Sequence, residues 1–257
     1  MIFPTATLIS DIHGVLPALE AMLAEEATDP SAILIVAGDI AIGPQPNQVI
    51  DRLRDFGDRV LAIGGNGDRE MLELLRGDGG AIEDPIAPWA ANELTAENRA
   101  WLADLPETRT IGIAGFGDVF VCHACPHNDM DILLVDTRIE RWVEALAGLP
   151  ASVSTVVLGH THMPFQRLVN RRRVINPGSI GMPYGGTGAH WVRLRDGIIE
   201  TRVTHFDIDT AMREIGESSS FPGAAEWVAP YLRSDYSDVE VIGIFGPRDG
   251  RESTGHQ

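Results

Sequence analysis

Three continuous apolar runs near the N-terminus constrain the fold of this chain more than any other feature. They cover residues 7–9, 32–37 and 60–63, and segments with apolar residues at helical spacing separate them. Strands that are apolar at every position, instead of at alternate positions, are typical of a sheet covered on both faces. The chain has 257 residues and is 44% apolar, which is enough for a sizeable core. We therefore predict an α/β fold.

The rest of the chain continues with shorter strands and helices. Residues 81–106 predict a small helical insertion in which Thr95 is an N-cap, and Asp196-Gly197 predicts a tight hairpin turn. We expect one domain over residues 1–207, followed by a helical extension and tail over 208–257 in the same globule. The later strands and helices that the pattern predicts lie at residues 110–114, 119–122, 155–158, 209–216 and 223–232.

A short apolar cluster near the C-terminus has a mixed alternation and follows a polar stretch. It consists of Val239, Val241, Ile242, Ile244 and Phe245. Because the cluster is too apolar for a free tail, we expect it to pack as a strand against the body or across a dimer interface. A homo-oligomer could then form through this segment. The last dozen residues are polar and rich in glycine, and we expect them to lack regular structure.

The charge balance excludes several classes of protein. With 20 basic against 37 acidic residues, the net charge of −17 disfavours nucleic-acid binding, which needs clustered basic residues. The same balance is compatible with divalent metals. No apolar run is long enough to span a membrane, and the N-terminus lacks a charged region followed by an apolar core, so we expect a cytoplasmic protein without a membrane segment. Two cysteines exclude a disulfide framework.

Metal-competent side chains follow successive predicted strands. An aspartate after a strand is usually a cap or turn residue, and a histidine in a loop is usually structural. Here, however, such residues follow several strands in succession. Because the carboxyl ends of these strands share one edge of an α/β sheet, a common site is favoured instead. Carboxylate, amide and imidazole together suit Mn, Fe or Zn better than Ca. These side chains are Asp11, His13, Asp39, Asn66, Asp68, His123, His160 and His162.

Five short blocks carry these residues, and in their order they resemble the signature of the calcineurin-like metallophosphoesterase superfamily. Residues 175–183 also resemble a segment of its bacterial phosphodiesterase branch, which is related to diadenosine tetraphosphatases. The whole ordered set is specific, whereas each block alone is weak. The blocks are Asp11-Ile12-His13, Gly38-Asp39, Gly65-Asn66-Gly67-Asp68, His123 and Gly159-His160-Thr161-His162.

The resemblance implies a four-layer α/β/β/α sandwich of two mixed sheets and a site for two divalent ions. It assigns Asp11, His13 and His162 to one ion, Asn66, His123 and His160 to the other, and Asp39 to the bridge between them. Among these, Asp39, Asn66 and His160 are expected to act in catalysis together with Asp68. Manganese is the favoured ion, with Fe, Ni, Co or Zn as alternatives, because the same ligands accept all of them.

The implied activity is hydrolysis of a phosphoester bond by a hydroxide held between the two ions. The favoured substrate is a small phosphodiester or an activated phosphate ester. A serine/threonine-type protein phosphatase and a non-catalytic binding module on the same fold are the alternatives. A nuclease is disfavoured by the charge and by the lack of interleaved basic and aromatic residues.

Two local features stand apart from the resemblance. Many members of the superfamily carry a histidine where this chain has Gly67, so the resemblance supplies no side-chain acid for the leaving group, and Asp68 is left to hold Arg69 or a neighbouring loop. The Cys122-His123-Ala124-Cys125 sequence has the spacing of a redox motif. We favour instead a buried thiol at Cys122 and a pocket-lining thiol at Cys125.

Overall fold

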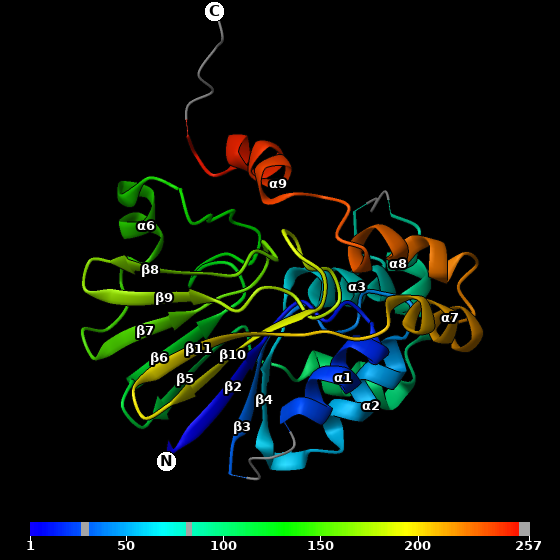
Figure 1. Cartoon of the computed structure of the whole chain (residues 1–257), viewed down its shortest axis with the longest axis horizontal. Helices are drawn as coiled ribbons and strands as arrows, with labels where there is room; N and C mark the ends of the chain where they lie inside the picture. The colour runs from blue at the N-terminus through cyan, green and yellow to red at the C-terminus, as the bar shows by residue number, and fades with distance from the viewer. Residues whose placement is uncertain (27–30, 81–83, 252–257) are drawn as a thin grey trace, which may run out of the picture.

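Two mixed β-sheets face each other, and helices cover both outer sides (Figure 1). The computed structural model describes residues 1–26, 31–80 and 84–251. The predicted four-layer sandwich is confirmed by this arrangement. The continuous apolar runs form three parallel neighbours in one sheet, as expected for strands buried on both faces.

The first sheet has the order β11-β10-β2-β3-β4, in which β10 runs antiparallel to β2. Its strands are β2 (Thr5–Ile9), β3 (Ile33–Ala37), β4 (Val60–Ile63), β10 (Ala189–Arg195) and β11 (Ile198–Thr204). The second sheet has the order β1-β5-β6-β7-β9-β8. Its strands are β1 (Ile2–Phe3), β5 (Thr108–Ile113), β6 (Gly117–Cys122), β7 (Val153–Val157), β8 (Phe165–Val169) and β9 (Arg172–Asn176).

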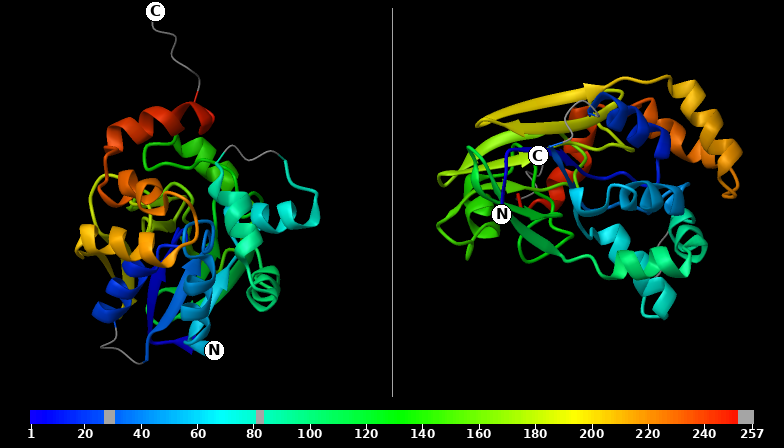
Figure 2. Two further views of the ribbon diagram at one scale, coloured as in Figure 1. Left: turned by 90° about the vertical axis from the view of Figure 1, so that its right-hand side faces the viewer. Right: turned by 90° about the horizontal axis from the view of Figure 1, so that it is seen from below.

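The helices fall mainly on the outer side of the first sheet, whereas α6 lies against the second (Figures 1 and 2). They are α1 (Leu16–Glu26), α2 (Pro46–Arg54), α3 (Asn66–Arg76), α4 (Ile86–Glu93), α5 (Ala96–Ala103), α6 (Ile139–Ala145), α7 (Ile208–Ser218), α8 (Ala224–Leu232) and α9 (Asp238–Phe245), with short 3-10 turns at Gly57–Arg59 and Gly246–Arg248. The predicted helical insertion contains α4 and α5, and the Thr95 side chain accepts a hydrogen bond from the Asn98 backbone as its N-cap. Residues 81–83 of that insertion lie outside the described residues.

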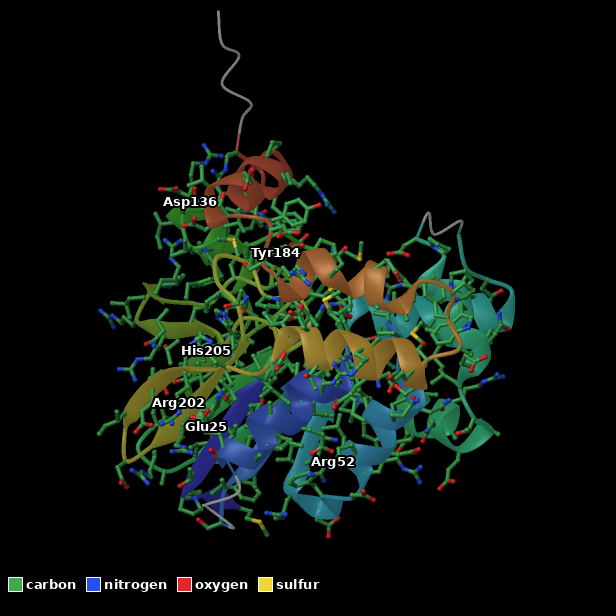
Figure 3. All side chains as sticks on the ribbon, turned by 45° about the vertical axis from the view of Figure 1, so that its right-hand side comes forward. Glu25, Arg52, Asp136, Tyr184, Arg202 and His205 are labelled. Atoms are coloured by element: carbon green, nitrogen blue, oxygen red, sulfur yellow. The ribbon has the colours of Figure 1, made fainter. Side chains whose placement is uncertain are left out.

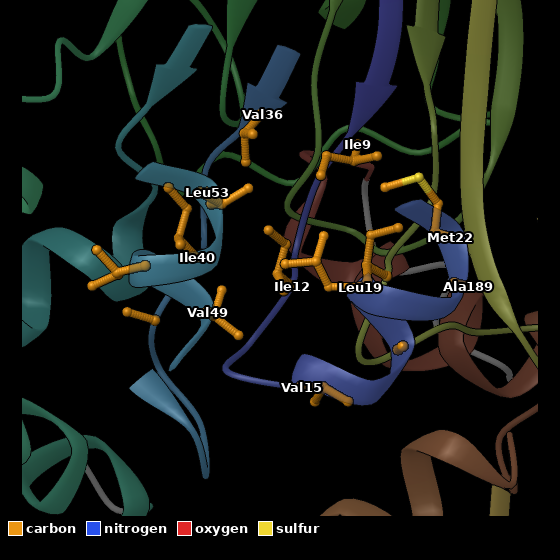
Figure 4. Close-up of a cluster of buried hydrophobic side chains, with 14 of the residues drawn as sticks. Ile9, Ile12, Val15, Leu19, Met22, Val36, Ile40, Val49, Leu53 and Ala189 are labelled. Atoms are coloured by element: carbon orange, nitrogen blue, oxygen red, sulfur yellow. The ribbon is translucent and has the colours of Figure 1, made fainter. Parts of the chain in front are cut away.

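Alternate residues of each central strand enter different cores. Ala6 and Leu8 of β2 pack between the two sheets, whereas Ile9 packs against the helices in the core drawn in Figure 4. A third core, which includes Trp142, lies between the second sheet and α6. This burial on both faces holds the strand ends, and the loops that follow them, at one edge of the molecule.

The C-terminal apolar cluster is helical, so the predicted strand is wrong. Ser237 caps α9, and the Glu240 side chain accepts from the Ser237 backbone in return, which completes a capping box. Helical spacing then directs Val241 and Phe245 toward the body of the protein, whereas Val239 is 73% exposed and Ile244 is 58% exposed. Packing of α9 against the body was expected, and the oligomer stays a prediction.

The residues after α9 are also more ordered than the sequence suggested. Asp249 is buried and accepts a hydrogen bond from the Thr137 hydroxyl at 2.6 Å. Arg251 forms two hydrogen bonds with Asp136, each at 2.9 Å. The Gly-rich composition predicted a tail without contacts. The carboxylates of Asp249 and Asp136 and the guanidinium of Arg251 instead hold the chain in place as far as Arg251. Residues 252–257 of the predicted tail lie outside the described residues.

Candidate metal centre

All seven predicted ligands lie at carboxyl ends of strands, and both sheets contribute. Five of them are buried, while Asn66 and His160 are half-buried. Among the described residues, two groups of side chains could each hold a metal ion, and between them they contain six of the seven. Asp11 and His13 follow β2, Asp39 follows β3, Asn66 begins α3 after β4, His123 follows β6, and His160 and His162 follow β7.

The first group joins Asp11, His13 and His162, with ligand atoms within 4.8 Å of one another. Nδ1 of His13 donates to the carbonyl oxygen of Ile42 at 3.2 Å, and Nδ1 of His162 donates to that of Met182 at 2.9 Å. In the neutral rings both Nε2 atoms therefore keep their lone pairs. These Nε2 atoms face each other at 3.1 Å, and His162 Nε2 lies 3.3 Å from Asp11 Oδ1. Lone pairs and a carboxylate this close together fit a cation between them.

The second group joins Asp39, His123 and His160, again within 4.8 Å. Nδ1 of His123 donates to the carbonyl oxygen of Ala37 at 2.7 Å, and its Nε2 lies 3.1 Å from Oδ1 of Asn66. Nε2 of His160 is buried and has no hydrogen-bond partner in the described part of the chain. A buried polar atom without a partner is costly unless a ligand satisfies it, so this nitrogen also fits a metal site.

Asp39 belongs to the second group and also approaches the first. Its Oδ2 is 3.4 Å from His123 Nε2 and 3.8 Å from His13 Nε2, so one oxygen is near a histidine of each group. Its Oδ1 accepts a hydrogen bond from the Gly67 backbone at 2.8 Å, which fixes the orientation of the carboxylate. This is the position that a bridging ligand requires.

The backbone at these positions is unusual. Left-handed conformations are uncommon outside glycine and cost on the order of 1–3 kcal/mol each, so they persist where the surroundings fix them, often at functional sites. Five of the predicted ligands adopt them: Asp11 (φ 54°), His13 (φ 50°), Asp39 (φ 52°), His160 (φ 65°) and His162 (φ 57°).

The end of β9 and the segment that follows it support the loops of the first group. Asn176 is buried and donates to the carbonyl oxygen of Gly159 at 2.8 Å. The Ser179 hydroxyl donates to the carbonyl oxygen of Asp11 and accepts from the Met182 backbone, both at 2.7 Å. The resemblance singled out this segment without explaining it, and the hydrogen bonds show that it positions the loops that carry the predicted ligands.

Asp68 lies outside both groups and holds a loop in place. Its carboxylate accepts hydrogen bonds from the backbone of Ile40 at 3.0 and 3.1 Å, of Ala41 at 3.1 Å and of Gly65 at 3.1 Å. These donors flank Asp39 and begin α3, so Asp68 fixes both loops. Of the two roles that the sequence left open for Asp68, the loop is the one observed, because Arg69 pairs with other carboxylates.

Burial and mutual charge set the protonation of the site. Burial lowers the pKa of His13 and of His160 to about 4, so both are neutral near pH 7. Burial also acts to lower the pKa of His123, but the Asp39 carboxylate outweighs it and raises that pKa to about 10. For Asp39, burial raises the pKa, and the His123 charge brings it below its ordinary value. A cation held by Asp39 and His123 would displace the proton on His123.

A cleft of about 540 Å³ lies beside the second group, between α3 and the loop after β6. Its volume lies in the range of small-molecule sites. His123 and Cys125 line it, together with Arg69, Leu72 and Leu105, so the pocket-lining position predicted for Cys125 is confirmed.

Both cysteines are free and buried, and burial raises the pKa of each thiol. Cys122 packs in the core beneath α6. Protonated, buried thiols are poor nucleophiles, which disfavours the redox interpretation of the motif.

The site residues and their order along the fold can now be compared with known proteins. The profile of the calcineurin-like phosphoesterase superfamily domain matches residues 5–195. The chain belongs to this superfamily. The resemblance found in the sequence is therefore confirmed, and membership identifies the chain as a metal-dependent phosphoesterase.

Individual relatives agree with this assignment. Phosphodiesterase YfcE of Escherichia coli strain K12 is 28% identical over 201 residues, which cover 74% of this chain and 86% of the relative. A metallophosphoesterase from Sphaerobacter thermophilus has a TM-score of 0.70 and 21% identity, covering 90% of this chain and 99% of that one. A putative diadenosine tetraphosphatase has a TM-score of 0.52 and 20% identity, covering 80% and 96%. The two structural likenesses bear on the fold alone.

The sequence did not indicate Tyr184 as part of the site, and it indicated Met182 only as one member of the segment 175–183. Met182 contributes a carbonyl oxygen, which any residue could supply, so no side-chain pattern identifies it. Tyr184 stacks on the imidazole of His162, with ring centroids 5.3 Å apart and an interplanar angle of 17°. Tyr184 itself could be read from the sequence, but no local pattern indicates that its ring would cover His162.

In the described residues, no helix combines the length and the apolar character that crossing a bilayer requires.

Proposed function

We propose that this protein hydrolyses small phosphodiesters or activated phosphate esters with a pair of divalent transition-metal ions. Asp11, His13 and His162 hold one ion, and Asn66, His123 and His160 hold the other, with Asp39 as the bridge. The observation that carries the proposal is the pair of Nε2 atoms 3.1 Å apart in the first group, together with an adjacent group whose Asp39 also lies 3.8 Å from His13 Nε2. Two ions bound there supply positive charge for phosphoryl oxygens and a water that is deprotonated at neutral pH.

The residues of the chain then have separate tasks. The hydrogen bonds from Nδ1 to main-chain carbonyl oxygens keep Nε2 of His13 and His162 directed at the ion. The Gly67 backbone holds Asp39 in the bridging orientation. His160 is half-buried, but its Nε2 is buried and free of hydrogen bonds within the described residues, so this nitrogen is available to the second ion. Asp68 acts through the loops that it fixes, and not on the substrate.

The absence of a side chain at Gly67 affects the choice of substrate. General-acid assistance contributes about 10²- to 10⁴-fold to rate, and its value grows as the leaving group becomes more basic. Without an acid at this position, the proposed enzyme favours leaving groups of low pKa. We therefore propose activated esters and nucleotide-type phosphates over simple alkyl esters.

Manganese is the ion that we propose, with Fe, Co, Ni or Zn as alternatives, because two carboxylates, one amide and four imidazoles accept all of them. We also propose a cytoplasmic location, which fits a supply of manganese and of small phosphoesters. YfcE is named a phosphodiesterase, which supports the diester over the protein phosphatase alternative.

A substrate panel on metal-stripped protein tests the proposal. An aryl phosphodiester, the matching monoester and a pyrophosphate are each assayed after addition of Mn, Fe, Co, Ni or Zn. We expect turnover only with added metal, with the diester fastest. The matched control is Asp196→Asn, an exposed carboxylate beside Arg195 in the turn between β10 and β11. Turnover at full rate in chelator, or two bound ions without turnover of any ester, would contradict the proposal, and the second result would favour a binding module.

A further inference from the structure

Two contacts hold the imidazole of His162, a hydrogen bond at Nδ1 and an aromatic ring stacked on one face. Its Nδ1 donates to Met182, and one face of its ring is covered by Tyr184 at an interplanar angle of 17°. The hydrogen bond alone leaves the ring free to tilt about the axis of that bond. The stacked face removes that freedom, because a tilt would drive the imidazole into the phenol ring.

Tyr184 in turn depends on the C-terminal segment. Phe245 and Tyr236 pack their rings against it, each with centroids 6.4 Å apart and with interplanar angles of 62° and 84°. In the part of the chain that the structure describes, no hydrogen bond to the Tyr184 hydroxyl is found, so its ring packing fixes it. Figure 3 shows Tyr184 beside the C-terminal helix.

The helix α9 also reaches the residue that follows His162. Val241 is buried in one cluster with Met163, Ile132 and Leu134, and Phe245 packs against the same cluster. The helix therefore shares a cluster with Met163, the chain neighbour of His162, and contacts Tyr184, which covers the face of the imidazole.

This helix is fixed at both ends. The capping box of Ser237 and Glu240 closes its start, and Asp249 and Arg251 hold its end against the loop around Thr137 and Asp136. Because both ends of the helix are fixed, Phe245 keeps its position against the Tyr184 ring. A free tail could not hold that ring in place.

We infer that the C-terminal helix is part of the metal centre: through Phe245 and Tyr184 it positions His162, so that occupancy of the first ligand group depends on α9 whereas occupancy of the second does not. This inference rests on the proposed function. The asymmetry follows from the contacts, because His123 is held by Ala37 in β3 and Asp39 by Gly67 in α3, far from α9 along the chain and outside its cluster.

Metal binding by variants tests this inference directly. Tyr184→Ala and Phe245→Ala remove the stacked ring and its support, and Tyr184→Phe keeps the ring without the hydroxyl. Phe221→Ala is the matched control, since Phe221 packs against Trp89 with centroids 5.2 Å apart, away from the α9 cluster. Equilibrium dialysis with Mn²⁺ gives the two dissociation constants, and electron paramagnetic resonance distinguishes a coupled pair of ions from a single one.

We expect wild type, Tyr184→Phe and Phe221→Ala to bind two ions as a coupled pair. Tyr184→Ala should bind one ion with unchanged affinity and the other about 10- to 100-fold more weakly, the range seen when support of a ligand is lost. Phe245→Ala should act in the same direction with a smaller effect. If Tyr184→Ala does not fold, Tyr184→Leu retains apolar volume and removes the planar face.

Two results would overturn the inference while leaving the proposed function intact: equal weakening of both ions in Tyr184→Ala, or two ions at wild-type affinity in both Tyr184→Ala and Phe245→Ala. A wild-type protein that binds no second ion would overturn the proposed function itself, and the inference with it.

Discussion

Gly67 offers a sharp test of the geometry around the proposed bridge. A Cβ atom built at Gly67 would lie 2.6 Å from Cγ2 of Ile42 and 3.2 Å from Oδ1 of Asp39, whereas ordinary contacts are 3.4–4 Å. The Ile42 methyl group would have to retreat by roughly 1 Å in a packed environment. Overpacking of this kind typically costs about 1–3 kcal/mol. Since Ile42 is only half-buried and can partly yield, we expect Gly67→Ala to lower the free energy of unfolding by about 1–2 kcal/mol.

A double-mutant cycle isolates that overlap. Ile42→Ala removes the methyl group and keeps the backbone carbonyl oxygen that accepts from His13. In this background Gly67→Ala meets no methyl group, and alanine is favoured over glycine in a helix, so the change should be neutral or stabilising by up to about 1 kcal/mol. The expected coupling between the two sites is therefore at least about 1 kcal/mol.

Urea unfolding of the four proteins in chelator measures this coupling without a contribution from metal. Equal effects of Gly67→Ala in the two backgrounds would refute the steric reasoning. The same background decides whether an acid can be restored. Gly67→His combined with Ile42→Ala should accommodate an imidazole next to the centre, whereas Gly67→His alone should lose stability and metal.

Three further predictions follow from the site. Asp39→Asn should stay folded by circular dichroism but bind fewer than two ions and lose most activity, and full turnover with two ions bound would exclude Asp39 as the bridge. Burial raises the pKa of Asp68 to about 7, so the test is made at about pH 8.5, where Asp68 is ionised. There Asp68→Asn places an amide NH₂ against backbone donors, and the free energy of unfolding should fall by about 2–4 kcal/mol, given that hydrogen bonds to charged groups contribute about 1.5–3 kcal/mol each. An unchanged urea midpoint would contradict its role in fixing the loops. For the Gly67 enzyme, the logarithm of the rate should fall steeply with leaving-group pKa, and a slope near zero with chemistry rate-limiting would reveal another acid.

The central strands were readable because they are buried on both faces. The run 60–63 was predicted at the bounds observed for β4, and the runs that form β2 and β3 were placed within two residues. Aspartate, asparagine and histidine side chains directly after these strands marked the site, since the chain has few other reasons to place them there. At these positions the local sequence pattern and the tertiary packing favour the same secondary structure.

The C-terminal helix shows where this agreement ends. The segment Val239 to Phe245 is rich in β-branched residues and fits both a strand and a helix, and its capping residues were present in the sequence. What decides between the two is that Val241 and Phe245 pack against Leu134 and Tyr184, residues distant along the chain. The stacking of Tyr184 on His162 was invisible for the same reason, because no local pattern records which ring will cover another.

The proposed ligands come from both sheets, and this has a thermodynamic consequence. If Asp11 and Asp39 from one sheet and His123 and His162 from the other hold the ions as proposed, loss of metal is linked to separation of the two layers. Free metal at 100 times its dissociation constant adds about 2.7 kcal/mol to the stability of such a protein. The temperature of unfolding should therefore rise with free metal concentration and fall in chelator. The concentration of free metal would then affect how long the protein stays folded, as well as its rate of hydrolysis.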